Sequence, residues 1–107
     1  MNFLYKKILI KLSGESLAGQ KHYGFDDNVI LTFTEEIAEL CKFGIKIGLV
    51  IGGGNIFRGN KANNWLNRID ADYMGMLGTV INGIALKSAF QYYGIKSKVF
   101  TAIEMLP

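Results

Sequence analysis

The sequence predicts an α/β fold with a mainly parallel sheet and helices on both of its faces. Residues 6–12 alternate between apolar and polar side chains, as a strand with one buried face does. Residues 26–44 carry apolar side chains at helical spacing, and residues 45–51 are rich in branched aliphatics. A strand, a helix and a second strand in this order form a βαβ unit, in which the two strands run parallel.

The helix of this unit has recognisable ends. Either Asp26 or Asp27 can serve as its N-cap, and Gly44 follows the last apolar residue as a terminator. The apolar positions between them fall on one side of a helix: Ile30, Phe33, Ile37, Leu40 and Cys41. We therefore expect an amphipathic helix that lies on the sheet.

Each of the two strands runs directly into glycine. The first, with Lys11 on the face opposite its isoleucines, continues into Ser13-Gly14, and the second continues into Gly52-Gly53-Gly54. Glycine lets backbone N–H groups approach an anion closely, and the guanidinium of Arg58 can clamp phosphate oxygens with paired donors. Neither loop fits the G-x-x-x-x-G-K-[ST] or G-x-G-x-x-G pattern. The loops alone predict a phosphate site, with a tight turn that binds no ligand as the alternative.

A long helix is expected from Asp70 to Tyr93, closed by Gly94, with Asp70 and Asp72 competing for the N-cap. Apolar side chains on nearly every side predict that this helix is buried all round. Three glycines each cost the helix roughly 1 kcal/mol relative to alanine, so we expect them to permit close packing against another backbone: Gly75, Gly78 and Gly83. So short a chain has little protein to cover the second side, which predicts a subunit interface. A third strand is expected at residues 97–103.

Composition narrows the class of protein further. A chain of 107 residues forms one domain at most, and its scattered lysines disfavour nucleic-acid binding despite a net charge of +3. The longest uncharged run, Tyr73 to Leu86, is shorter than the roughly 20 residues that span a bilayer. Cys41 is the only cysteine, which excludes a disulfide within the chain and a cysteine-based zinc site. A cytoplasmic protein without membrane or nucleic-acid partners is the simplest expectation.

Three segments, in this order and spacing, resemble the bacterial uridylate (UMP) kinases of the amino-acid kinase superfamily. They are residues 11–15 (Lys-Leu-Ser-Gly-Glu), residues 50–59 with Gly-Gly-Gly-Asn-Ile-Phe-Arg-Gly, and residues 72–83 with Asp-Tyr-Met-Gly-Met-Leu. The similarity extends from about Lys6 to Pro107. It implies an amino-acid kinase-like α/β sandwich and transfer of phosphate from ATP to UMP, giving UDP. It also implies Mg²⁺ accompanying ATP, and homohexamers in the cytoplasm.

The resemblance also implies roles for individual residues. Lys11 and Arg58 would be catalytic. The ATP-binding residues would be Lys11, Leu12, Ser13, Gly14, Gly54 and Arg58. UMP would meet Gly53 and Asp72, the aspartate through the sugar, and no residue would be a dedicated metal ligand. A GTP effector region would include Gly19, Gln20, Lys21, His22, Tyr23 and Gly24.

Taken without the resemblance, several of these residues have simpler readings. Lys11 reads as a solvated lysine on a strand face, and Arg58 as a residue that caps a loop or pairs with Asp70. Asp72 reads as a helix-start aspartate, which the macrodipole favours.

Proteins of this family are roughly twice as long as this chain. Residues 1–107 are therefore expected to form a single amino-terminal part of the domain, truncated before the carboxy-terminal nucleotide-binding half. Such a sheet would keep an exposed edge and an uncovered face. Two functions follow: a UMP kinase, or a catalytically incomplete fragment that binds phosphate or nucleotide weakly or acts only as an oligomerisation module. Residues 55–58 and 72–77 disfavour a superfamily kinase that acts on a carboxylate or carbamate.

Overall fold

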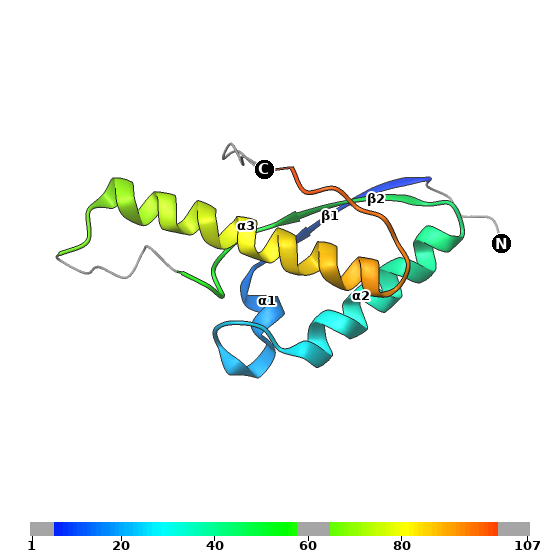
Figure 1. Ribbon diagram of the computed structural model, residues 1–107, viewed down its shortest axis with the longest axis horizontal. Helices are drawn as coiled ribbons and strands as arrows, with labels where there is room; N and C mark the ends of the chain where they lie inside the picture. Colours follow the sequence, from blue (N-terminus) through cyan, green and yellow to red (C-terminus); the bar gives the residue numbers. More distant parts are fainter. Residues whose placement is uncertain (1–5, 58–64, 101–107) are drawn as a thin grey trace.

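The computed structural model describes residues 6–57 and 65–100 (Figure 1). Along these residues the elements are β1 (Lys7–Leu12), α1 (Glu15–Ala18), a 3-10 helix η1 (Gly19–Lys21), α2 (Asp27–Lys42), β2 (Lys46–Ile51) and α3 (Arg68–Tyr92). The succession β1, α2, β2 is the βαβ unit that the sequence predicts. The α/β class is confirmed.

The two strands pair in parallel, from Lys7 opposite Lys46 to Leu12 opposite Ile51. Because the strands are equally long and in register, both end at the same edge of the sheet. The two glycine loops therefore begin side by side, each directly after its strand.

The helices cover one face of this sheet. A core of buried residues from α1, α2 and α3 packs against the inward side chains Ile10, Ile47, Leu49 and Ile51; the core consists of Leu17, Ile30, Ile37, Leu86, Ala89 and Phe90. On the opposite face Leu9 is 69% exposed and Val50 is 47% exposed. The uncovered face expected of a truncated sheet is present, and helices that would cover it are not among the described residues.

The helix ends follow local chemistry. Asp26 caps α2, since its side chain accepts hydrogen bonds from the N–H groups of Asn28 and Val29. The predicted terminators hold as well: Gly44 after α2 and Gly94 after α3 have φ angles of 87° and 80°, in the left-handed region that favours glycine.

The predicted start of α3 is wrong by a few residues. The cap is Asn67, whose side chain accepts from the N–H groups of Ile69 at 2.7 Å and Asp70 at 3.4 Å. Asparagine caps a helix as well as aspartate does. Neither Asp70 nor Asp72 is therefore needed as the cap, and both lie inside the helix.

Two further expectations about this half of the chain are not met. Residues 97–100 form no strand, although their burial alternates as in an extended chain, and residues 101–103 lie outside the described part. The helix α3 is not buried all round, because one side remains exposed. Within the described residues, no helix combines the length and the apolar character needed to cross a membrane.

Candidate functional site

The two glycine loops pack against each other at the carboxyl edge of the sheet. The N–H of Gly52 donates to the carbonyl of Leu12 at 3.4 Å. A β-carbon built on Gly14 would lie 2.6 Å from the nitrogen of Gly54 and 2.8 Å from the oxygen of Gly52. Any side chain at Gly14 would therefore push the second loop away. The structure brings together the two loops that the sequence predicts as one phosphate site.

Gly53 has a structural reason to lack a side chain that the sequence did not suggest. Its β-carbon would point at α3, 2.6 Å from the nitrogen of Thr79 and 2.9 Å from the oxygen of Gly75. The missing side chain thus allows the loop backbone to lie directly on the helix backbone. This contact sets how closely the loop approaches α3. The role of Gly53 in binding UMP stays a prediction.

The three glycines of α3 differ in what a β-carbon would meet. A β-carbon on Gly78 would lie 3.2 Å from the oxygen of Gly53, and one on Gly83 would lie 3.1 Å from a methyl group of Val99. One on Gly75 would meet no atom of the described residues within 4 Å. The predicted close packing against another backbone is confirmed for Gly78.

Three of the residues predicted to bind ATP lie where β1 ends and the first glycine loop begins. Lys11 and Ser13 are exposed, and Leu12 is half-buried. A β-carbon on Gly54 would overlap the carboxylate of Glu15, so an acidic side chain lies directly against the second loop. Arg58 lies outside the described residues.

Asp72 is exposed and lies in the first turns of α3. Gly53 meets this helix at Gly75 and Thr79, so Asp72 lies about one turn nearer the helix start, or roughly 5 Å along its axis. The structure places Asp72 on the element that carries the loop, one turn away from the contact itself.

Two asparagines that sequence reasoning missed lie directly behind the glycine loop. Asn55 and Asn82 are 1% and 0% exposed. The amide nitrogen of Asn82 donates to the side-chain oxygen of Asn55 at 2.6 Å and to the carbonyl of Gly52 at 2.7 Å. The signal was available, because Asn82 is a polar residue in an otherwise apolar helical stretch and Asn55 directly follows the glycines.

The loop predicted as an effector region, residues 19–24, is hydrogen-bonded at its last residue to Asn55 of this pair. The amide nitrogen of Asn55 donates to the carbonyl of Gly24 at 2.9 Å, and the N–H of Gly24 donates to the carbonyl of Asn55 at 2.7 Å. His22 adopts a φ angle of 72° and Tyr23 is 77% exposed. The loop is thus anchored at Gly24 and exposed at its tip, and its effector role stays a prediction.

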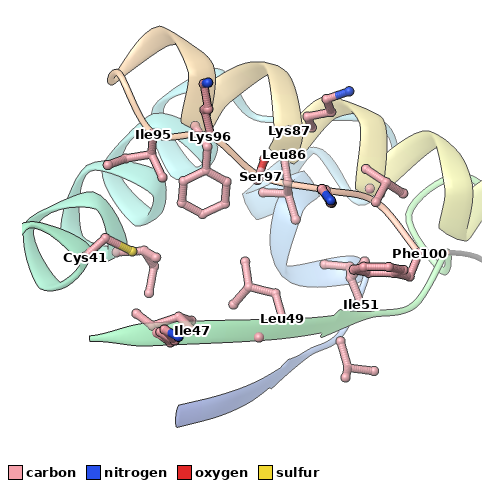
Figure 2. Close-up of a pocket in the computed structure, with 18 of the residues that line it drawn as sticks. Cys41, Ile47, Leu49, Ile51, Leu86, Lys87, Ile95, Lys96, Ser97 and Phe100 are labelled. Carbon is pink, nitrogen blue, oxygen red and sulfur yellow. The ribbon is translucent and has the colours of Figure 1, made fainter. Parts of the chain in front are cut away.

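A cavity of about 830 Å³ lies elsewhere, between β2, α3 and the segment after α3 (Figure 2). In the close-up, Ile47 and Leu49 lie on one side and Ile95 and Ser97 on the other. Burial raises the pKa of the Cys41 thiol, which also lines this space. The lining is largely apolar and includes none of the residues of the two loops that are predicted to bind phosphate, so the cavity is not the phosphate site.

Among the residues that the structure describes, no group of three or more His, Cys, Asp or Glu side chains could hold a metal ion.

Comparison with known proteins agrees with the fold. The sequence model of the amino acid kinase family matches residues 6–107. The chain is 52% identical over 104 residues to the uridylate kinases of Porphyromonas gingivalis and of Bacteroides thetaiotaomicron. This chain belongs to the amino acid kinase family.

Solved structures give the same result. The crystal structure of UMP kinase from Ureaplasma parvum superposes with a TM-score of 0.82 and 35% identity, covering 94% of this chain and 45% of that one. That of Bacillus anthracis superposes with a TM-score of 0.73 and 43% identity, covering 82% and 36%. The two uridylate kinase matches cover 96% of this chain and 44% of each relative's length. The chain therefore spans less than half the length of the relatives it matches.

Proposed function

We propose that this protein acts in phosphoryl transfer from ATP to UMP, as a uridylate kinase. The observation that carries the proposal is the packing of two glycine loops into one site at the carboxyl edge of a parallel sheet. Relatives of this chain that share half of its residues are named uridylate kinases, which supports the choice of UMP as acceptor.

The arrangement suits this chemistry because phosphoryl transfer depends on alignment and on neutralising negative charge rather than on covalent catalysis. Backbone N–H groups of Ser13-Gly14 and Gly52–Gly54 would hold nucleotide phosphates, those of ATP and, at Gly53, that of UMP. Lys11, exposed one residue before the end of β1, would supply a positive charge to the transferring group. Arg58 would add a second cation with two parallel donors.

The acceptor and the metal complete the proposal. Asp72 would accept a hydrogen bond from the sugar of UMP, one turn from the point where the loop meets α3. Mg²⁺ would arrive with ATP as part of the substrate, held by phosphate oxygens and water. No residue of the chain is assigned to it.

The exposed side of α3 is proposed as a contact between subunits. Tyr73, Leu77, Ile81 and Ile84 lie along it, each between 43% and 50% exposed. Four large apolar side chains in one stripe resemble the centre of an interface more than a solvated surface. A homohexamer, with GTP acting at residues 19–24, would follow the family pattern.

The second candidate is a fragment without catalysis of its own, which binds phosphate weakly or acts only through its oligomer contact. The uncovered sheet face favours it, because Leu9 and Val50 would need a covering layer in an active enzyme. The two candidates differ in whether the second half of the site is supplied.

The deciding experiment follows labelled γ-phosphate from ATP into UMP, with CMP, aspartate and carbamate as competing acceptors. It uses the 107-residue chain and, in parallel, the product of the complete reading frame that contains it. Label in UDP alone establishes the kinase. Absence of transfer by both proteins would refute it, and transfer by the frame product alone would make the 107-residue chain the second candidate.

A matched pair of variants tests the role of Lys11. Lys11→Met should lower the rate of transfer about 100-fold, because it removes a charge that stabilises the transition state. Lys7→Met removes another exposed lysine from the same face of the same strand, four residues earlier, and should leave the rate unchanged. Equal rates in the two variants would remove Lys11 from the mechanism.

A further inference from the structure

The hydrogen bonds of the buried asparagine pair, Asn55 and Asn82, define the orientation of both side-chain amides. Its four amide hydrogens are all used: Asn82 donates to Gly52 and to Asn55, and Asn55 donates to Gly24 and back to Asn82. The orientations of both amides follow from chemistry, since the carbonyls of Gly24 and Gly52 can only accept. The nitrogen of each amide must therefore face its carbonyl, and flipping either amide would place two oxygens together.

The pair determines which way the glycine loop faces. A peptide group is planar and trans, so its C=O and N–H point in opposite directions. Asn82 holds the Gly52 carbonyl toward α3 at 2.7 Å. The N–H of Gly53, on the same peptide, is therefore directed away from Asn82. Because glycine stands on both sides of this peptide and lacks a Cβ, little else in the local chain would stop it from rotating.

The next peptide of the loop is held in a comparable way. The Gly53 carbonyl accepts from the N–H groups of Ile56 at 2.9 Å and Phe57 at 3.0 Å. The nitrogen of Gly54 lies beside Gly14, at the contact between the two loops. Two successive carbonyls of the loop are thus held by partners, one by the asparagine pair and one by the following turn.

We propose that Asn55 and Asn82 are positioning residues for phosphate binding. They hold the Gly52–Gly53 peptide with its carbonyl inward, so that the N–H of Gly53 faces the nucleotide phosphates. The inference deepens the proposed function and rests on it. Neither asparagine touches the reacting atoms, and each acts through the glycine backbone.

The competing explanation is that the pair only stabilises the fold, as satisfied buried amides do. A test must therefore separate nucleotide affinity from stability. Asn82→Asp suits this purpose because it preserves shape and reverses the hydrogen-bonding role of one atom. A carboxylate at this place accepts rather than donates, so it repels the Gly52 carbonyl and favours the rotated peptide, with the N–H of Gly53 turned inward.

Thr34→Val is the matched control. Thr34 is also 0% exposed, and its hydroxyl donates to the Ile30 carbonyl at 2.7 Å within α2. The variant loses one buried hydrogen bond on an element that carries no residue of the glycine loops. It should lower the unfolding temperature without weakening the binding of ATP or UMP.

The affinities for ATP and for UMP are measured by calorimetric titration at pH 8, well below the unfolding temperature of each variant, on the product of the complete reading frame. Asn82→Asp should bind UMP, the nucleotide predicted to meet Gly53, about tenfold more weakly than the parent, the usual scale of a lost buried hydrogen bond. Part of the loss should be recovered at pH 6 relative to the parent, because burial raises the pKa of a carboxyl group and its protonated form can donate to Gly52 again. Thr34→Val should match the parent at both pH values.

Three outcomes would overturn the proposal. Equal affinity in Asn82→Asp and the parent would leave the pair a purely structural feature, while the proposed function stands. An equal loss in Thr34→Val would assign the effect to general destabilisation. Absence of both ATP and UMP binding by the parent would overturn the proposed function together with this inference.

A structure of the parent with bound ATP and UMP tests the inference without any variant, should Asn82→Asp fail to fold. The Asn82 to Gly52 hydrogen bond should persist, with the N–H of Gly53 directed at a phosphate oxygen. A rotated Gly52–Gly53 peptide in that complex would refute the positioning role.

Discussion

The two sides of α3 have similar composition and different surroundings. One side carries Gly78, Asn82 and Leu86, which lie against the glycine loop and the core. The other carries Leu77 and Ile81, which are 43% and 44% exposed. Both sides are apolar enough to be buried, and only one is buried by this chain.

The difference shows what a hydrophobic pattern can and cannot specify. Periodicity records that a side chain avoids water, and it does not record which surface covers it. The glycines are more informative, because they mark where another backbone approaches. Gly78 lies on the side that meets Gly53 of the same chain, so it belongs to the internal contact and would be a poor probe of a subunit interface.

The largest effect is expected on the internal side. Gly53→Ala would place a methyl group within 2.9 Å of three backbone atoms of α3, which cannot move as a flexible side chain can. We expect a loss of about 3 kcal/mol in the free energy of unfolding, measured by urea denaturation.

Gly48→Ala is the control for this variant. Gly48 lies in β2, five residues before Gly53, and its β-carbon would meet only the end of the Leu9 side chain at 3.1 Å. Its free energy of unfolding should stay close to that of the parent. A Gly53→Ala variant as stable as Gly48→Ala would show that the loop does not lie on α3 as closely as described.

The next effect concerns the exposed side. Leu77→Arg should change the free energy of unfolding of the isolated subunit by no more than about 0.5 kcal/mol, as exposed substitutions generally do. It should dissociate the oligomer, because a charge placed in an apolar contact loses its hydration. Light scattering measures the mass directly.

Leu31→Arg provides the comparison for that experiment. Leu31 is 36% exposed on α2, away from the proposed contact, and its substitution should leave the mass unchanged. The interface is wrong if the parent is already a monomer, or if Leu77→Arg has the same mass as an oligomeric parent.

The sequence was sufficient for the elements whose signals are local. The βαβ unit, the Asp26 cap and the terminators Gly44 and Gly94 all follow from spacing and from single residues with strong preferences. The meeting of the two glycine loops was also predictable, because parallel strands in register end at one edge. These features depend on a few neighbouring residues.

Apart from the start of α3, where Asn67 was overlooked as the cap, the features that failed depend on distant partners. The third strand at residues 97–103 required a ladder to another strand, and over residues 97–100 no such ladder forms. The Asn55–Asn82 pair joins residues 27 positions apart in sequence. Each asparagine could be noticed by itself, but nothing in the sequence shows that the two are partners. Gly53 shows the same limit, since the sequence shows a glycine and not the helix that passes beside it.

The smallest effect is expected at Gly75, the one glycine of α3 for which the described residues show no close contact that requires a glycine. A β-carbon on Gly75 would meet no described atom within 4 Å, and the residue lies in mid-helix. Gly75→Ala should therefore raise the free energy of unfolding by up to about 1 kcal/mol, through helix propensity alone.

Gly78→Ala, one turn later, gains the same propensity but meets the Gly53 carbonyl at 3.2 Å, so it should be the less stable of the two. If urea denaturation ranks them in the opposite order, close approach to the loop does not distinguish the two glycines. If instead Gly75→Ala leaves stability unchanged and lowers the mass in light scattering, Gly75 belongs to the subunit contact. The proposed contact would then extend beyond the exposed apolar stripe toward the side of α3 that meets the glycine loop.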